Sequence, residues 1–164
     1  MTVSPLVRRQ YQIFIERPPE AVFAFQTNLK NHPRTCPPDQ MEEVVSCTVT
    51  PLCEGAHITF RAKHGGVWRN LEAEIADWNP PNSFTSRQVK GPFGSWVHRH
   101  KFVPFQAGTL MTDQIEYTVP AGPLGILAEK LWLGSHLDEF FHFRQAEAKR
   151  LLEQVGRIKG REAA

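Results

Sequence analysis

The chain has 164 residues, of which 41% are hydrophobic and 22% are charged, and this size and composition predict one compact domain. We take the domain as residues 1–164, with its core at about residues 6–155. Nineteen lysines and arginines stand against seventeen acidic residues, and no run of four basic residues occurs, so we expect no nucleic-acid partner.

Export and membrane signals are missing from the sequence. The N-terminal segment MTVSPLVRRQ lacks the apolar stretch of a secretory signal, so we expect a cytoplasmic protein. No segment reaches the roughly 18 uncharged apolar residues that a membrane span needs. Cys36, Cys47 and Cys53 are odd in number and form no CxxC pair, which favours free thiols over disulfides or structural zinc.

The first third of the chain predicts a strand and two short helical segments. Alternating apolar and polar residues in LVRRQYQIFIERP predict a strand that prolines end. The next segment, PPEAVFAFQTN, begins with proline and has helical apolar spacing, so it predicts a short helix. A second short helical turn is expected in LKNHPRTCPPD.

The rest of the chain predicts strands and then a helix. Six strands are each closed by glycine, proline or asparagine, at 42–50, 56–64, 67–78, 83–90, 95–105 and 109–119. From Pro123 to about Val155 the apolar residues recur with a helical period. Gly134 interrupts this pattern and predicts a kink or break.

This order of elements predicts an α+β fold. The apolar face of an antiparallel sheet must be covered, and only the C-terminal helix is long enough to do so. From Gly134 onward it would run roughly 30 Å, about the length of a nine-residue strand. We therefore expect a helix-grip fold, in which a seven-stranded antiparallel sheet wraps around the long C-terminal helix, with two short helices after the first strand.

Several segments resemble a known superfamily. ERPPEAVFAFQTNLKNHPRTCPP, KGPFGSWVHRHKF, TLMTDQIEYTVPAGPLGILAEKL and EFFHFRQAEAKRLL resemble the START/Bet v 1-like (SRPBCC) helix-grip superfamily, in particular its bacterial polyketide cyclase/dehydrase-like and lipid-transport-like branch. The resemblance covers about residues 6–155 and implies the fold described above. The superfamily includes lipid and hormone carriers, aromatase/cyclases, oxygenase catalytic domains and chaperone activators, so the shared fold does not settle the activity.

The segment SWVHRHKF carries two histidines on one strand. Residues two apart in a strand share a face, so His98 and His100 point the same way as Trp96 and Phe102. Arg99 and the other alternate residues point to solvent, and both imidazoles therefore face the interior.

The next strand brings one carboxylate to the same face. In TLMTDQIEYTV the alternation turns Asp113 inward among apolar residues. A two-residue loop at Ala107–Gly108 would pair Phe102 with Asp113 and place Asp113 diagonally opposite His100, within reach of a side chain.

This polar cluster has four interpretations. As a metal site, the two histidines and Asp113 would supply at most three ligands, and no further residue has matching spacing. A separate ExxH motif at Glu139 and His142 occurs once, whereas di-iron bundles use two copies. We therefore expect no metal and no cofactor. The cyclase resemblance implies that His98 and His100 act as acid and base with Asp113 orienting them. A self-satisfied buried cluster is a third interpretation. The fourth, which we favour over an enzyme, is the polar lining of a ligand cavity.

The expected ligand is a small hydrophobic molecule such as a lipid, an isoprenoid or a polyketide-like aromatic, and a homodimer is compatible with the sequence. The residues expected to bind it come from four strands and the C-terminal helix: Ile58, Phe60, Leu71, Ile75, Trp96, His98, His100, Phe102, Met111, Asp113, Ile115, Tyr117, Phe140 and Phe141.

Other polar and aromatic residues suggest supporting roles. Arg144 interrupts the apolar helix stripe and predicts either an ion pair with Asp113 or Glu116, or a cation for a ligand carboxylate. We expect Arg8, Arg9, Arg99 and Lys101 to be solvated. Phe23 and Phe25 form either ordinary core or, with the loop NHPRTCPP, a lid over the cavity.

Overall fold

The computed structural model describes residues 5–40, 42–64, 67–120 and 122–162. The strands are β1 (Val7–Ile15), β2 (Glu42–Cys47), β3 (His57–His64), β4 (Val67–Asn79), β5 (Ser83–Lys90), β6 (Ser95–Phe105) and β7 (Gly108–Thr118). The helical segments are α1 (Pro19–Thr27), the 3-10 turns η1 (Leu29–Asn31) and η2 (Pro33–Thr35), α2 (Gly122–Ala128), the π-helical turn η3 (Glu129–Leu133) and α3 (Gly134–Glu162). The expected order of elements is confirmed, with bounds that differ by a few residues.

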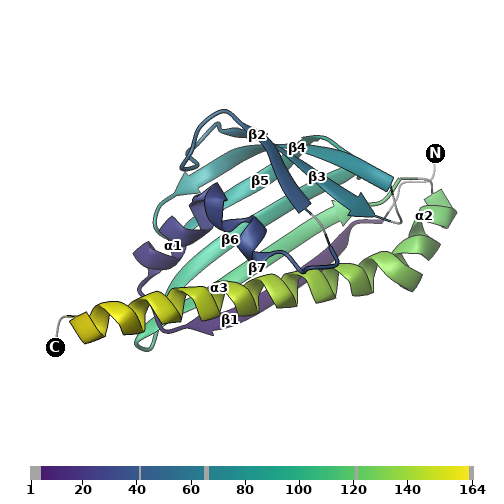
Figure 1. Cartoon of the computed structure of the whole chain (residues 1–164). Coiled ribbons are helices and arrows are strands. Elements are labelled where there is room, and N and C mark those ends of the chain that lie inside the picture. Colours follow the sequence, from purple (N-terminus) through teal and green to yellow (C-terminus); the bar gives the residue numbers. More distant parts are fainter. Residues whose placement is uncertain (1–4, 41, 65–66, 121, 163–164) are drawn as a thin grey trace.

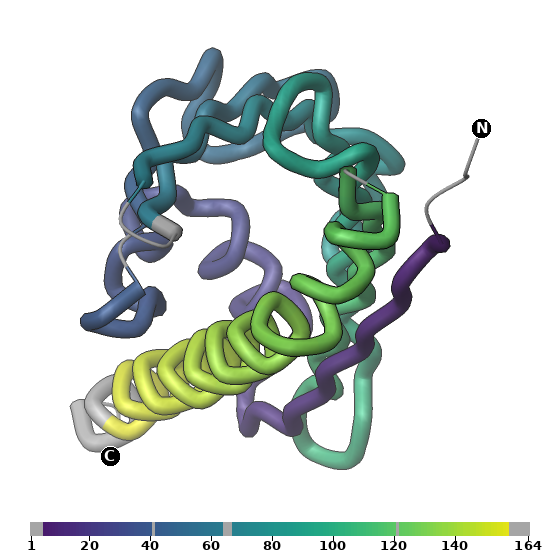
Figure 2. Tube along the Cα trace, turned by 90° about the vertical axis from the view of Figure 1, so that its right-hand side faces the viewer, coloured from purple at the N-terminus to yellow at the C-terminus, as the bar shows by residue number. Residues whose placement is uncertain are grey.

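The seven strands form one antiparallel sheet in the order β1-β7-β6-β5-β4-β3-β2. The first strand therefore pairs with the last, and the other strands follow as hairpins. Figure 2 shows the sheet curving around the space in front of the C-terminal helix. The α+β helix-grip prediction is confirmed.

The two halves of the sheet are covered differently. On one half, α3 packs on β1, and α1 packs on β6 and β7. This half holds the fully buried Ile15, Phe102, Ile115 and Tyr117. A cavity lies between the half made by β3, β4 and β5 and the C-terminal helical segments.

The C-terminal helix changes its winding just before Gly134. Residues 129–133 form a π-helical turn, and α3 continues from Gly134 with ordinary helical backbone angles. The expected irregularity is present, but the helix does not break at the glycine. A Cβ at position 134 would collide with the guanidinium of Arg9, so glycine is required here for a close approach rather than for a bend.

The hairpin between β6 and β7 has a register that differs from the prediction. Phe105 pairs with Gly108 and His100 pairs directly with Asp113, so the loop is Gln106–Ala107 and each residue of β6 faces a partner two residues earlier in β7 than predicted. Gln106 takes the left-handed conformation, with φ at 50°. Gly108 belongs to the strand, because a Cβ there would collide with the backbone oxygen of Ile15 on β1.

No helix within the described part of the chain is long and apolar enough to cross a membrane. All three cysteines lie in that part as well, and they are free thiols.

Candidate ligand cavity and its two polar clusters

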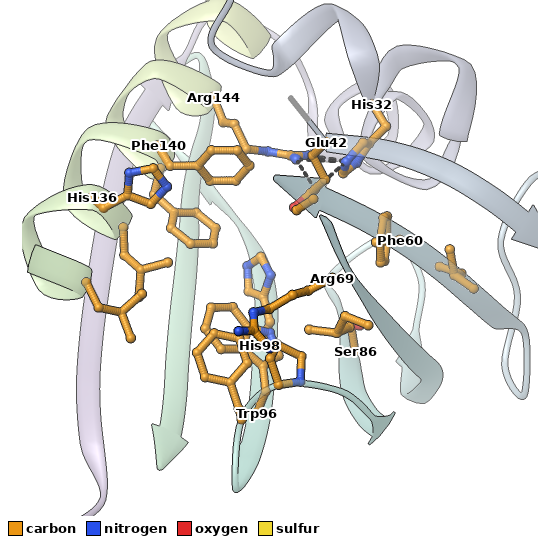
Figure 3. Close-up of a pocket in the computed structure, with 18 of the residues that line it drawn as sticks. His32, Glu42, Phe60, Arg69, Ser86, Trp96, His98, His136, Phe140 and Arg144 are labelled. Carbon is orange, nitrogen blue, oxygen red and sulfur yellow. Dashed lines mark hydrogen bonds and ion pairs between the residues drawn. The ribbon is translucent and has the colours of Figure 1, made fainter. Parts of the chain in front are cut away.

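A cavity of about 460 Å³ lies between the outer half of the sheet and the C-terminal helical segments. Pockets of this size hold small organic ligands. Its walls are mainly apolar and aromatic side chains from β3, β4, β5 and β6 and from α2, η3 and α3. Polar groups enter it at a few places, several of which are labelled in Figure 3.

The structure divides the sequence-predicted ligand residues into two groups. One group lines the cavity: Ile58, Phe60, Leu71, Ile75, Trp96, His98, His100, Phe140 and Phe141. The other group lies outside the lining: Phe102, Met111, Asp113, Ile115 and Tyr117, all of which are buried.

The second group shares its face with the cavity residues but is covered by other elements. Phe102 packs against Phe23 of α1, and Met111 accepts a hydrogen bond from Gln26 of the same helix. Phe23 is therefore core rather than lid. Sharing a face of the sheet is thus not sufficient to reach the cavity, because α1 and α3 cover the β6–β7–β1 half.

His98, His100 and Asp113, which we call the floor cluster, meet where the cavity reaches the covered half of the sheet. His98 Nε2 lies 2.7 Å from Asp113 Oδ1 and donates to it. His100 Nδ1 lies 3.1 Å from the same oxygen but without hydrogen-bond geometry, so this buried nitrogen contacts the carboxylate and makes no hydrogen bond with the described residues. The expected proximity of His100 and Asp113 is confirmed, and His98 is also in contact with the carboxylate.

Aromatic packing and one amide hold the floor cluster in place. The His98 and His100 ring centroids are 3.7 Å apart, and His100 stacks on Phe84 at 4.2 Å. Behind the histidines, Gln145 Nε2 of α3 donates to Asp113 Oδ2 at 2.6 Å. Both carboxylate oxygens are therefore engaged.

Burial and mutual contact set the charges of this cluster. Burial alone would raise the pKa of Asp113, but the contacts with His100 and His98 outweigh it and hold that pKa far below its usual range. Burial lowers the pKa of His100 to about 4, and repulsion by His98 adds to the lowering. At neutral pH the cluster thus holds an ionised Asp113 beside a neutral His100.

A second cluster, His32, Cys36 and Glu42, borders the cavity near η2 and β2, and we call it the edge cluster. His32 Nε2 lies 2.6 Å from Glu42 Oε1 and donates to it. Arg144 Nη2 lies 3.2 Å from His32 Nδ1, and Arg144 Nη1 lies 3.5 Å from Glu42 Oε1 and 3.9 Å from the Cys36 sulfur. Arg144 of α3 therefore ties this edge of the sheet to the helix (Figure 3).

The prediction that Arg144 pairs with Asp113 or Glu116 is thus wrong, because its acidic partner is Glu42. Asp113 is held by Gln145, one residue further along α3, and Glu116 points outward to Arg8 and Arg99. The side chains of adjacent helix residues diverge by about 100°, so Gln145 faces the floor while Arg144 reaches the edge.

Burial also shifts the titration of the edge cluster. It lowers the pKa of His32, and the charge of Arg144 lowers it further. Burial raises the pKa of the Cys36 thiol to about 11. At neutral pH this cluster therefore holds a neutral imidazole and a protonated thiol.

The end wall of the cavity is fixed by Arg9, which was expected to be solvated. Arg9 lies on the inward face of β1 and pairs with Glu129 at 2.8 Å and with Asp138 at 2.9 Å. Tyr117 donates to Glu129 at 3.0 Å. The solvated-face prediction for Arg9 is wrong, because Arg9 alternates in phase with the buried Tyr11.

The cavity contains one further arginine. Arg69 of β4 is an exposed residue that lines it, and no acidic residue of the described segments pairs with it. Figure 3 shows its side chain directed toward the part of the pocket that holds Trp96 and His98. Sequence reasoning missed Arg69; it lies two residues before Leu71 on the face of β4 that was expected to be inward, which is the signal that could have found it.

The fold and the cavity define a helix-grip protein with an internal apolar site, and comparison with known families agrees. The family model described as "Polyketide cyclase / dehydrase and lipid transport" matches residues 15–137. The chain belongs to this family, and the resemblance noted in the sequence is confirmed. No curated protein sequence matches the chain.

Solved structures show the same fold at low sequence identity. TTHA0849 from Thermus thermophilus is 19% identical with a TM-score of 0.68, and the match covers 92% of this chain and 99% of that one. Ms6760 from Mycobacterium smegmatis is 15% identical with a TM-score of 0.66, over 92% and 99% of the two chains. The di-domain ARO/CYC StfQ from the steffimycin biosynthetic pathway is 14% identical with a TM-score of 0.71, over 92% of this chain and 52% of that one.

Proposed function

We propose that this protein binds a small, mainly apolar molecule with one acidic group in the cavity between the sheet and the C-terminal helix. The observation that carries the proposal is the cavity of about 460 Å³ with its apolar and aromatic walls. Burying apolar ligand surface there supplies about 25 cal/mol per Å² before the entropic costs of binding. The family, whose description includes lipid transport, supports the same class of ligand.

Arg69 is the reason for expecting an acidic group on the ligand. Of the two arginines that line the cavity, Arg144 is paired with Glu42, whereas Arg69 has no acidic partner among the described residues. A ligand carboxylate would give Arg69 a charge-assisted hydrogen bond. His98 would contribute a second polar contact nearby.

The test compares two ligands of the same chain length, dodecanoate and dodecanol, by displacement of a fluorescent apolar probe. We expect Leu71→Trp, which fills the cavity, to weaken both ligands, and Val89→Trp on the exposed surface of β5 to weaken neither. We expect Arg69→Gln to weaken dodecanoate about tenfold and to leave dodecanol unchanged. Lys90→Gln is the matched control, because Lys90 is exposed and lies outside the lining. Equal binding to the Leu71→Trp variant and the parent would refute the proposal.

A cyclase or dehydratase is the second function, and the contact of His98 with Asp113 favours it. His98 Nε2 donates to the carboxylate, which leaves Nδ1 of a cavity-lining imidazole without a hydrogen bond from the described residues. A histidine held in this way can serve as a general acid or base, with Asp113 as the orienting group.

Turnover of a poly-β-ketone thioester analogue, followed by chromatography of the products, tests this function. We expect His98→Ala to lower the rate about 100-fold or more while the urea melt shows an intact fold. Absence of any cyclised product with the parent protein would exclude this activity and leave ligand binding unaffected.

A further inference from the structure

Three potential metal-ligand atoms converge in the floor cluster. His98 Nε2, His100 Nδ1 and an Asp113 carboxylate oxygen all lie within 4.8 Å of one another. The two nitrogens lie 2.7 Å and 3.1 Å from the same Asp113 oxygen. Metal ligands about 2.0–2.2 Å from a common ion are separated by distances of this order.

The Nδ1 nitrogen of His100 is the second observation at this cluster. Nδ1 of His100 is buried and has no hydrogen bond from the described residues, although it is close to a carboxylate oxygen. Leaving such a group unsatisfied in the interior is destabilising. A cation between the two imidazoles and the carboxylate would satisfy His100 and Asp113 together.

The edge cluster has the same number of potential metal-ligand atoms, but a protein cation, Arg144, already lies against them. His32, Cys36 and Glu42 also lie within 4.8 Å of one another. The guanidinium of Arg144 contacts all three of them. In the floor cluster no arginine or lysine of the described segments contacts the carboxylate, which is engaged only by His98, His100 and Gln145.

The surroundings of the floor cluster fit a metal site in two further respects. Gln145 donates to the second oxygen of Asp113 at 2.6 Å, as outer-shell partners do when they orient a ligating carboxylate. His98 and His100 line the cavity while Asp113 lies behind them. An ion held by the three would therefore have its open coordination positions on the cavity side.

We propose that His98, His100 and Asp113 bind a divalent first-row transition-metal ion, such as Zn²⁺, that faces the ligand cavity. Two imidazole nitrogens and one carboxylate suit this class of ion, and three protein ligands are the number found in open rather than structural zinc sites. His98 would bind the ion through the Nε2 lone pair as the neutral tautomer, with its proton moved from Nε2 to Nδ1. Binding therefore becomes weaker as the pH falls and the ligands are protonated.

The experiment titrates the full chain, first stripped with a chelator, with Zn²⁺ in a calorimeter and with Co²⁺ in an absorption spectrometer. We expect one Zn²⁺ per chain and Co²⁺ absorption bands in the visible range. His100→Ala should abolish both signals. Gln145→Leu, which removes only the outer-shell amide, should weaken Zn²⁺ binding by about tenfold or more.

His32→Ala and Cys36→Ser are the matched controls at the edge cluster, and both should bind Zn²⁺ like the parent. Circular dichroism and a urea melt establish that each variant is folded, and His98→Ala replaces His100→Ala if the latter is not. The proposal fails if the folded parent binds no Zn²⁺, if binding persists in both histidine variants of the floor cluster, or if Cys36→Ser abolishes it. Dodecanoate binding measured in the presence of the chelator tests the proposed function separately, so the two proposals can fail independently.

Discussion

The floor cluster is built on two adjacent strands, whereas the edge cluster joins a loop, an edge strand and, through Arg144, the C-terminal helix. Both contain histidine and an acidic residue, and both border the cavity. In the edge cluster a protein cation contacts the acid and the imidazole. In the floor cluster the carboxylate faces two imidazoles and an amide, and one imidazole nitrogen has no partner among the described residues.

The difference separates two roles that similar residues can have. A cluster whose charges are balanced by its own arginine holds elements together. A cluster that contains an ionised carboxylate and an unsatisfied nitrogen beside a cavity can accept a ligand, a proton or a metal ion. Three measurements test this comparison.

The largest effect is expected from Asp113→Asn in the floor cluster. The substitution removes a buried charge that accepts from His98 and Gln145, and we expect the free energy of unfolding to fall by about 2–3 kcal/mol. Asp77→Asn is the matched control, because Asp77 is exposed, pairs with the exposed Arg87 and has a left-handed backbone that asparagine tolerates. Urea denaturation measures both, and equal small losses would mean that the carboxylate is not a structural centre.

A smaller loss is expected from Arg144→Met in the edge cluster. This change removes a guanidinium that contacts His32, Cys36 and Glu42, and we expect a loss of about 1–2 kcal/mol. Arg150→Met on the same helix removes an exposed pair with Glu147 and should leave the melt close to that of the parent, because exposed ion pairs contribute little. If the two variants melt alike, Arg144 does not hold the edge of the sheet.

The pH dependence of stability gives the smallest effect. His32 has a lowered pKa in the fold, first because of burial and then because of Arg144, so protons bind more tightly to the unfolded chain. Its contribution to stability is therefore complete above the ordinary histidine pKa of 6.5 and is lost as the pH falls below that value. The charged and titratable groups around it are Arg144, Glu42, Cys36 and, across the cavity floor, His98.

His32→Gln isolates this contribution, because the glutamine amide can still donate to Glu42 but does not titrate. As the pH falls below 6.5, we expect the free energy of unfolding to decrease less in the variant than in the parent. Urea denaturation over a pH series measures this difference. Identical pH profiles would show that His32 is not the responsible group.

The sequence predicted the fold because its strongest signals are local and repeated. Alternation along β6 and β7 places the histidines and Asp113 on one face, and any short hairpin loop with an even number of residues brings them together. The predicted register of the β6–β7 hairpin was wrong because Gly108 was taken as a turn residue. A glycine is needed at position 108 for a different reason, which is the close approach of the β1 backbone. That contact joins residues far apart in the sequence, and no local rule detects it.

The edge cluster could not be predicted for a related reason. Its members come from a segment with 3-10 turns and from an edge strand, and the arginine that contacts them comes from a helix, so no strand register or helical period relates them. The same holds for Arg9, whose partners Glu129 and Asp138 are fixed only when α3 is placed on β1. Side-chain periodicity identifies a face, but it does not say which element covers that face.

Gly134 has a consequence for how this chain could change. The cavity wall formed by Gly125, Ala128, Trp132 and Leu133 precedes it, and that wall is attached to β1 through Arg9 and Glu129, which need the glycine for their close approach. The wall is therefore tied to β1, at the edge of the sheet farthest from β2 and β3. Under the proposed function, substitutions in this wall would alter the size of the space, and with it the choice of ligand, while the buried residues packed between β1, β6, β7 and α1 stay as they are.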